Sequence, residues 1–466
     1  MSCRLLIDGR LVDGERSGPV VNPATGQPFA DAPRAGRDQV EQAVAAANRA
    51  FPVWSATSVE QRAAAIGALA DAVAARADAL APLLTREQGK PIAEARGEIA
   101  LTVEALRYHM PLRLPPRTLA ADGGSMIVEQ RYPLGVVAAI VPANYPLLLL
   151  ALKLAPALIA GNVVIAKPAA TTPLTTLMLG ELAADLFPPG VVQIVSDADD
   201  VGPLLTAHPG IAHISFTGTT ARGRQVMAAA AGTIKRLTLE LGGNDAALLL
   251  PGADVGAIAP GLFAGAMANA GQSCLAIKRV YAPRAMMDDL CDAMAREAAR
   301  VVPGDGLDPA TTMGPVHRAD QRDRLNAMLD EAKRRGQVVN APAPVPQSGY
   351  FIAPAIVRDL PDDAALVREE QFGPLLPVLA YDREDEAIAR INDSPYGLSA
   401  SLWGARDHAL ALAARIQCGT VWVNRHMDLP FAMPLGGAKQ SGFGRHQGIE
   451  GVMEFTQARI VNAGPD

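Results

Sequence analysis

The chain has 466 residues, of which 49% are hydrophobic and 19% charged, and its formal net charge is −6. This length suggests two or three domains, and the apolar content supplies large cores and argues against wholesale disorder. Lysines and arginines are scattered without a basic block, which argues against nucleic acid or an anionic membrane as a partner.

The cysteines and the N-terminus bear on the cellular compartment. The chain has four cysteines without any CxxC pair: Cys3, Cys274, Cys291 and Cys418. This spacing favours neither a disulfide framework nor a zinc site, so we expect no metal and a reducing cytoplasm. The first residues, "MSCRLLIDGRLVDGE", lack the apolar segment of a signal peptide. Residues 135–166 are apolar, but prolines and Lys153 interrupt them, which favours buried strands and a helix over a membrane span.

In the first part of the chain, turn-rich segments alternate with alanine-rich helices. Residues 36–54 and 58–89 show helical spacing, and Ser58 followed by Glu60 and Gln61 suits a helix start. From about residue 135, short β-branched runs alternate with helices. Strands are expected at 135–141, 162–168, 191–196, 213–218 and 236–241, and helices at 147–160, 173–187, 200–207 and 220–231. This alternation predicts βαβ units in a parallel, doubly wound sheet.

The pattern restarts near residue 243 and predicts a second α/β domain. Its strands are expected at 245–250, 278–283 and 419–424, and its helices at 255–270 and 285–301. Two further segments read differently: 118–135 indicates a hairpin around Asp122-Gly123-Gly124, and 455–463 indicates a lone strand. Strands outside both sheets are candidates for an oligomerisation arm, because an unpaired strand edge favours pairing.

Three residues at expected strand ends could carry covalent chemistry. Cys274 lies among small residues in "ANAGQSCLAIK", although a buried, inert thiol is the simpler reading. Glu240 ends an apolar strand, where burial can raise the pKa of a general base, or where the carboxylate only caps the backbone. Asn144 lies between two prolines in "VPANYP" and could donate to an oxyanion, or be an ordinary turn residue.

Two further segments suit a nucleotide, although no GxGxxG follows a strand. "ISFTGTTARG" ends a strand and opens a helix through Gly218, Thr219 and Gly223, where free N–H groups attract a phosphate; a plain turn is equally compatible. Lys167 ends another strand and could contact a ribose or phosphate, or simply be solvated. A thiol, a carboxylate, an amide and such a helix start together suit thiohemiacetal chemistry, with hydride transfer to a nicotinamide and hydrolysis of a thioester.

At this point the chain resembles the aldehyde dehydrogenase superfamily, from about residue 6 to 462. The resemblance rests on ordered motifs: "VPANYP", "AKPAATTP", "FTGTTARG", "LELGGN", "NAGQSC", "EEQFGP", "NDSPYGLSAS", "GTVWVN" and "PLGGAKQSGFGRHQG". It implies an α/β fold with two doubly wound Rossmann-like domains, one for the cofactor and one for catalysis, and a small β oligomerisation arm. The expected boundaries are 1–117 with 136–241 for the cofactor domain, 242–436 for the catalytic domain, and 118–135 with 453–466 for the arm.

The resemblance also implies roles for individual residues. Cys274 would be the nucleophile and Glu240 the general base, and Asn144 with the Cys274 backbone N–H would form the oxyanion hole. The cofactor, NAD or NADP, would be bound by Val141, Pro142, Ala143, Lys167, Ala170, Gly218, Thr219, Gly223, Leu241, Glu370 and Phe372. The aldehyde pocket would be lined by Tyr108, His109, Ser273, Leu275, Arg425, His426 and Phe431. A homodimer or homotetramer is expected.

Several departures from the family pattern bear on specificity. Relatives usually carry Trp at Ala143, and many that prefer NAD carry Glu at Ala170, so NADP use stays open. His446 stands where relatives often have a second, proton-relaying Glu. CoA-acylating relatives typically lack the carboxylate of Glu240, so its presence favours hydrolysis to a free acid.

The remaining alternatives concern the substrate and the reaction class. Apolar side chains near residues 427–433 suit an apolar aldehyde, whereas Arg425 and His426 could pair with the carboxylate of a semialdehyde. A CoA-acylating reaction and a Cys-dependent acyltransferase are the other readings. The latter usually needs a His beside the thiol, and none of the histidines stands in such a motif.

Overall fold

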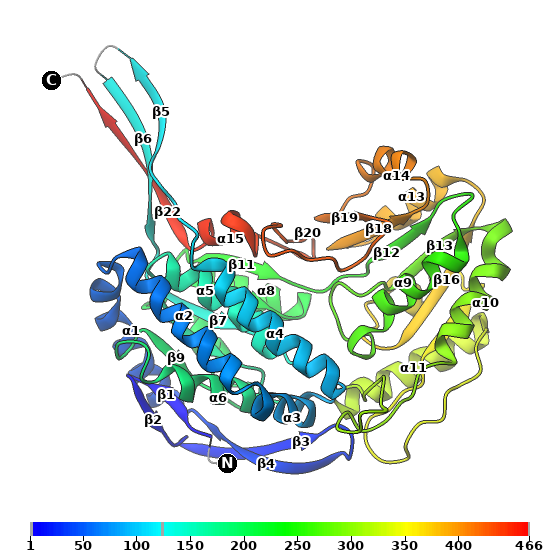
Figure 1. The fold of residues 1–466 in the computed structure, drawn as a ribbon, viewed down its shortest axis with the longest axis horizontal. Helices are drawn as coiled ribbons and strands as arrows, with labels where there is room; N and C mark the ends of the chain where they lie inside the picture. Colours follow the sequence, from blue (N-terminus) through cyan, green and yellow to red (C-terminus); the bar gives the residue numbers. More distant parts are fainter. Residues whose placement is uncertain (1–2, 123–124, 465–466) are drawn as a thin grey trace.

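The computed structural model describes residues 3–122 and 125–464 and has two large α/β units with a projecting arm (Figure 1). The sheet of the first unit has the order β2-β1-β9-β8-β7-β10-β11-β21. The five strands β9, β8, β7, β10 and β11 run parallel to one another. At the two edges, β1 pairs antiparallel with β9, β2 with β1, and β21 with β11. Its strands are β1 (Leu5–Ile7), β2 (Arg10–Val12), β7 (Val136–Ile140), β8 (Val163–Lys167), β9 (Val192–Ile194), β10 (His213–Thr217), β11 (Arg236–Glu240) and β21 (Gly442–Phe443). This confirms the expected doubly wound, parallel core.

Helices cover this sheet, and most begin within three residues of their expected positions. They are α1 (Arg37–Ser55), α2 (Val59–Ala75), α3 (Ala77–Gln88), α4 (Ile92–His109), α5 (Pro146–Ile159), α6 (Leu174–Ala183), α7 (Gly202–Ala207) and α8 (Thr220–Ala231). The expected start at Ser58 is confirmed, since its side chain accepts from the Gln61 N–H while the Gln61 side chain accepts from the Ser58 N–H. The helical spacing of 58–89 belongs to two helices, which meet at Arg76.

The N-terminal strands were not expected from the sequence. β1 and β2 extend the first sheet, and β3 (Arg16–Asn22) and β4 (Gln27–Arg34) form a separate hairpin along the base of the molecule (Figure 1). Their alternation is hard to recognise because charged residues and prolines fall inside both strands of the hairpin, and β3 also contains a glycine.

The second unit is a sheet in the order β14-β15-β16-β13-β12-β18-β19, parallel except for β14. Its strands are β12 (Ala246–Leu249), β13 (Arg279–Pro283), β14 (Gln337–Val338), β15 (Ala355–Arg358), β16 (Leu375–Tyr381), β18 (Ser399–Trp403) and β19 (Thr420–Val423). Its helices are α9 (Val255–Met267), the short 3₁₀ turns η1 (Ala268–Gly271) and η2 (Arg284–Met286), α10 (Met287–Ala298), α11 (Ala319–Arg335), α12 (Ala365–Arg368), α13 (Glu384–Asn392) and α14 (Arg406–Ala413).

Both faces of this second sheet are buried, as a doubly wound sheet requires. Along β12, Leu248 belongs to the apolar cluster on one face and Leu249 to the cluster on the other. The helix expected over 255–270 ends earlier, at Met267, because Asn269 and Ala270 adopt left-handed backbone conformations.

The arm is a three-stranded antiparallel sheet in the order β22-β6-β5, built from β5 (Arg117–Asp122), β6 (Ser125–Pro133) and β22 (Thr456–Ala463). It extends away from both units (Figure 1). The expected hairpin of 118–135 and the expected lone strand of 455–463 therefore meet, and the expected turn residues Gly123 and Gly124 lie outside the described residues.

The residues between the second sheet and the arm, 437–452, were assigned to no domain from the sequence. They hold β20 (Ala438–Lys439), which pairs with β17 (Tyr396–Gly397), then β21 and α15 (Gly448–Met453). Because β21 pairs with β11, the chain returns to the edge of the first sheet beside Glu240. Across residues 3–122 and 125–464, no helix is both long and apolar enough to cross a membrane.

Candidate active site

The carboxyl ends of the first sheet's parallel strands gather the candidate residues on one edge. Ile140 pairs with Lys167 and with Phe216, and Thr217 pairs with Glu240, so the chain leaves β7, β8, β10 and β11 at the same level. Ligands of open α/β sheets bind at such an edge.

Two adjoining cavities of about 330 and 730 Å³ lie along this edge. They share the lining residues Pro142, Ala143, Thr217, Gly218, Thr219, His317 and Arg318. The smaller cavity reaches Lys167, and the larger one reaches Cys274. Together they form a continuous site that begins at the end of β8 and ends at the thiol.

Cys274 reaches the larger cavity through an unusual turn after α9. Asn269, Ala270 and Gly271 all have positive φ, at 51°, 55° and 72°, so the chain reverses sharply behind the thiol. A Cβ at Gly271 would collide with the carbonyl of Gly373, so only glycine fits there. Lys278 Nζ donates to the Gly271 carbonyl at 2.8 Å and holds the turn.

Asn144 is held against this turn. Its Nδ2 donates to the Gln272 carbonyl at 3.1 Å, which fixes the amide with its NH₂ group toward the Cys274 segment. The backbone carbonyl of Asn144 accepts from Lys90 Nζ at 2.8 Å and from Asn269 Nδ2 at 3.1 Å. One N–H of the Asn144 amide therefore stays available for an oxygen placed beside Cys274.

Lys90 belongs to a fully buried ion pair that sequence reasoning missed. Its Nζ lies 2.6 Å from Glu98 Oε2, both side chains are 0% exposed, and Nζ also lies 3.8 Å from the Tyr145 ring centroid. Glu98 Oε1 accepts from the N–H of Leu147 at 3.0 Å, so the pair holds both sides of the Asn144 loop. The sequence signal was limited to a lysine between the helices α3 and α4 and a glutamate within α4, neither with a visible partner.

The surroundings of Cys274 and Glu240 disfavour the charged form of each side chain. Burial, together with the nearby carboxylates of Glu370 and Glu240, raises the pKa of the Cys274 thiol to about 12. Burial also raises the pKa of Glu240 to about 8, against the opposing charge of Lys153. Glu240 Oε1 is buried and has no hydrogen-bond partner among the described residues. Such a carboxylate is suited to accept a proton near neutral pH.

Lys153 and His446 lie behind Glu240. Lys153 Nζ contacts His446 Nε2 at 3.2 Å and Ser215 Oγ at 3.1 Å, and burial lowers the pKa of Lys153 to about 7. Burial, together with the charge of Lys153, keeps the pKa of His446 well below its usual value. A neutral imidazole therefore occupies the place of the second carboxylate that the resemblance led us to consider.

Most of the expected cofactor residues line the two cavities. The smaller cavity is lined by Val141, Pro142, Ala143, Lys167, Ala170, Gly218 and Thr219. The larger cavity is lined by Pro142, Ala143, Asn144, Gly218, Thr219, Leu241, Cys274, Glu370 and Phe372. Gly223 lines neither: a Cβ there would lie 2.6 Å from Leu241 Cδ2, so this glycine serves helix packing. Gly218 likewise has no room for a Cβ, which would lie 2.6 Å from the Phe216 ring.

The residues of the two cavities fit a dinucleotide. Thr217 Oγ1 is buried at their junction and lacks a hydrogen-bond partner in the described part of the chain. Helix α8 begins at the same place, and its N-cap Thr219 accepts from the Arg222 N–H at 3.3 Å, which leaves other N–H groups of the first turn for a phosphate. A dinucleotide has a ribose in each half; Lys167 at one end of the site and Glu370 with Phe372 at the other could each contact one of them.

The expected aldehyde-pocket residues lie outside both cavities, as the described residues define them. Tyr108 packs against His109 and Phe431, with ring centroids 5.2 and 6.0 Å apart. Burial lowers the pKa of His109 to about 4, and its Nδ1 contacts the Ala105 carbonyl at 2.7 Å.

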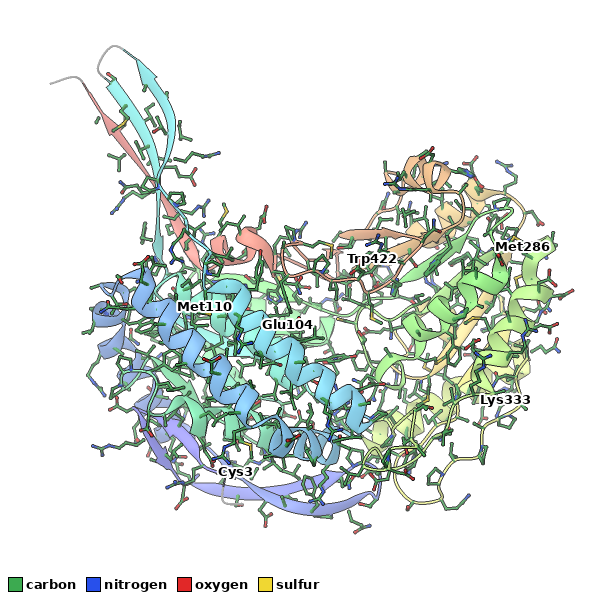
Figure 2. All side chains as sticks on the ribbon, viewed as in Figure 1. Cys3, Glu104, Met110, Met286, Lys333 and Trp422 are labelled. Carbon is green, nitrogen blue, oxygen red and sulfur yellow. The ribbon has the colours of Figure 1, made fainter. Side chains whose placement is uncertain are left out.

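A second group lies next to the thiol. Leu275 forms an apolar cluster with Leu398, Trp422 and Leu435, against which Cys274, Met427, Leu429 and Met433 pack. Trp422, on β19, is marked in Figure 2. Ser273 Oγ accepts from the Leu275 N–H at 3.3 Å and lies 3.9 Å from Met427 Sδ. His426 Nε2 lies 2.6 Å from the Leu275 carbonyl, and burial lowers the pKa of His426 to about 4. Arg425 is mostly exposed and paired with Asp428.

Comparison with known proteins places the chain in a family. The model of the aldehyde dehydrogenase family matches residues 11–461. A curated relative, aldehyde dehydrogenase LUC3 from Fusarium sp, is 37% identical over 98% of this chain and 97% of its own. Among solved structures, an NADP-dependent enzyme of E. coli has a TM-score of 0.96 at 32% identity, covering 99% of this chain and 98% of its own. Betaine aldehyde dehydrogenase of Staphylococcus aureus in complex with NAD+ has a TM-score of 0.95 at 30% identity, covering 99% and 94%. The chain belongs to the aldehyde dehydrogenase family and is an NAD(P)-dependent enzyme that oxidises an aldehyde to a carboxylic acid.

Proposed function

We propose that the aldehyde is oxidised through a covalent intermediate on Cys274, and that water then releases the acid with Glu240 as general base. The observation that carries this proposal is the meeting of three separate segments: the turn after α9, the Asn144 loop and the end of β11. The first two are tied by the hydrogen bond from Asn144 to Gln272, and the third ends in a buried carboxylate oxygen that has no hydrogen-bond partner in the described part of the chain.

In the first step, Cys274 Sγ adds to the aldehyde carbonyl. The thiol proton is lost to solvent in the cavity that Cys274 lines as the C–S bond forms, because a thiol with a pKa of about 12 does not ionise beforehand at neutral pH. The carbonyl oxygen becomes an oxyanion, which accepts from Asn144 Nδ2 and from the Cys274 backbone N–H. A preorganised donor of this kind typically contributes about 10²–10³ in rate.

In the second step, the tetrahedral adduct loses hydride and becomes a thioester. Bound NAD(P)+ supplies the hydride acceptor. Lys167 would hold the adenosine ribose, Thr219 and the start of α8 the pyrophosphate, and Glu370 with Phe372 the nicotinamide half. Glu370 is oriented by the Gly243 N–H, which donates to its Oε1 at 3.0 Å.

In the last step, Glu240 removes a proton from water, whose oxygen attacks the thioester and expels the Cys274 thiolate. The elevated pKa makes the carboxylate a stronger base than an exposed glutamate, although a smaller share of it is ionised at neutral pH. Lys153, buried behind it, opposes this shift and stabilises the carboxylate.

The substrate we propose is an apolar aldehyde of medium size. The apolar cluster of Leu275, Trp422 and the methionines and leucines around them packs directly against Cys274. Neither Arg425 nor His426 offers a free cation for a substrate carboxylate, because the first is paired with Asp428 and the second is half-buried and neutral. Hexanal should exceed succinate semialdehyde at least tenfold in kcat/KM, and the reverse preference would overturn this assignment.

The organisation of the chain follows from these roles. We propose that 1–117 with 136–241 bind the cofactor, that 242–436 carry the thiol, and that the arm of β5, β6 and β22 joins subunits into a homodimer or homotetramer. The arm supports this because Leu119, Met126 and Ile460 are exposed on it. Light scattering should give a dimer or tetramer, and removal of the last strand should give smaller species.

A direct assay tests the reaction. Mixing the protein with NAD+ or NADP+ and a panel of aldehydes should produce reduced cofactor at 340 nm without CoA. Cys274→Ser should abolish this signal, whereas Cys418→Ser, which alters a half-buried thiol away from both cavities, should retain it. Turnover that requires CoA would indicate the acylating reaction, and no cofactor reduction would refute the proposal.

A further inference from the structure

An acidic loop after β9 borders the cavity end that holds Lys167. Residues 197–200 read Asp-Ala-Asp-Asp, and the three carboxylates have different surroundings. Asp197 is fully buried, with Oδ2 accepting from the Val201 N–H at 3.0 Å and Oδ1 lying 2.8 Å from Lys167 Nζ. Asp200 turns the other way and pairs with Arg16 at 2.7 Å.

Asp199 is the carboxylate of this loop that lines the cavity. Its φ of 68° is left-handed, a conformation that Asp and Asn tolerate better than most residues. Its side chain is 56% exposed, and its Oδ1 lies 4.0 Å from Lys167 Nζ. Ala170 lines the same cavity and brings no polar group.

The charge balance at this end is unfavourable for a further anion. Lys167 is 5% exposed, and its Nζ already has Asp197, the more distant Asp199 and the Pro168 carbonyl at 3.3 Å as neighbours. Two carboxylates thus surround this ammonium, and another nearby cation, Arg34, does not line the cavity and donates to the Asp197 backbone carbonyl at 2.7 Å. A phosphate monoester, which carries about −1.5 to −2 charge near pH 7, would face Asp199 without an unpaired lysine to receive it.

Two arginines also line this cavity. Arg318 is held by Asp320 in a bidentate pair, with both distances 2.8 Å. Arg222, on α8, has Gln225 Oε1 as its side-chain partner at 3.2 Å and is the cation through which a phosphate could still bind. The buried Thr217 hydroxyl, unpartnered among the described residues, marks the same cavity as a ligand site.

We propose that Asp199 makes the enzyme select NAD+ over NADP+, a conclusion that rests on the proposed cofactor site. Its carboxylate accepts from the free hydroxyls of the adenosine ribose and repels a phosphate at the 2′ position. The missing carboxylate at Ala170 is thereby supplied from a neighbouring loop. The preference that the sequence left open is thus assigned to a residue outside the family motifs.

Binding measurements without aldehyde test this selectivity. Kd values for NAD+ and NADP+ are measured by calorimetry on the full-length protein, on Asp199→Asn and on Asp200→Asn. Asn keeps the shape and the left-handed backbone at 199, and Asp200→Asn removes one charge from the same loop without altering the cavity lining. The unmodified enzyme should bind NAD+ at least about tenfold tighter than NADP+, a difference of about 1.4 kcal/mol.

Asp199→Asn should tighten NADP+ binding about tenfold, and Asp200→Asn should leave both Kd values within about twofold. Because the charge is partly exposed, the preference should also narrow as salt is raised. Three results would refute the role of Asp199 in selectivity. They are equal affinity for both cofactors, equal effects of Asp199→Asn and Asp200→Asn on the Kd values, and tight NADP+ binding by the unmodified enzyme that Arg222→Gln abolishes. If neither cofactor binds, the cofactor site itself is wrong, whereas non-selective binding with aldehyde oxidation intact refutes Asp199 alone.

Discussion

Hydrolysis of the thioester should depend on pH through Glu240. Burial raises the pKa of this carboxyl to about 8, so about one enzyme molecule in ten holds the carboxylate at pH 7 and about nine in ten at pH 9. Because the carboxylate is the base, the rate of acyl-enzyme breakdown should rise about tenfold between these pH values and then level off.

Rapid mixing separates this step from the earlier ones. The enzyme is mixed with excess aldehyde and NAD+, and the initial burst of NADH reports thioester formation, while the steady rate reports its breakdown. At pH 7 the burst should be large, and at pH 9 it should shrink as breakdown accelerates. Glu240→Gln should slow breakdown by about 10²–10⁴ and remove the pH dependence.

Two results would refute this reasoning. One is a steady rate in Glu240→Gln equal to that of the unmodified enzyme with no accumulated intermediate. The other is a breakdown rate in the unmodified enzyme that stays constant between pH 6 and 9, since a base with a raised pKa cannot act without titrating in that range.

Three further outcomes are expected. Asn144→Ala should lower kcat about 10²–10³ with NAD+ affinity unchanged, measured by steady-state kinetics and calorimetry; an unchanged kcat would remove it from the oxyanion hole. Glu98→Gln should lower the free energy of unfolding by about 3–5 kcal/mol in urea titrations, because it leaves the buried Lys90 charge without its partner. The control Glu104→Gln, on the exposed face of the same helix and labelled in Figure 2, should change it by less than about 0.5 kcal/mol. Finally, Glu240→Gln should raise Tm more at pH 9 than at pH 6, measured by thermal melts at both pH values. Because the pKa of the folded-state carboxyl is raised to about 8, the unmodified enzyme loses stability as pH rises toward 8. Glutamine does not ionise, so the variant does not lose this stability.

The parallel cores could be predicted from local sequence, and the regions joined by distant contacts could not. β7, β8 and β10 are short apolar, β-branched runs whose type is decided by their own residues and by the helices between them. The N-terminal strand β1 depends instead on the distant strand β9, where Leu6 pairs with Ile194, and β2 pairs with β1. α9 ends at Met267 because Asn269 and Ala270 take left-handed conformations, which Asn tolerates but Ala does not favour.

In the candidate site, too, local sequence predicted some residues, whereas others depend on contacts between distant parts of the chain. The sequence placed Asn144, Lys167 and Glu240 at or just after expected strand ends, and the parallel pairing of β7, β8, β10 and β11 brings these ends to one edge of the sheet. Spacing did not predict the pair of Lys90 and Glu98, since the partners of Glu98 include backbone N–H groups 49 residues further on. Nor did it predict Asp199, whose importance comes only from the cavity that it lines. The roles of these residues in the reaction stay predictions.

The central claim is that Cys274 carries the acyl group, and mass spectrometry of the trapped intermediate tests it most directly. Glu240→Gln is mixed with hexanal and NAD+, quenched in acid and digested. A hexanoyl mass is expected on the peptide that contains Cys274; it should form only with NAD+ and be absent from the double variant that also carries Cys274→Ser. An acyl group on another residue, or NADH formed in the burst without any acylated peptide, would contradict it.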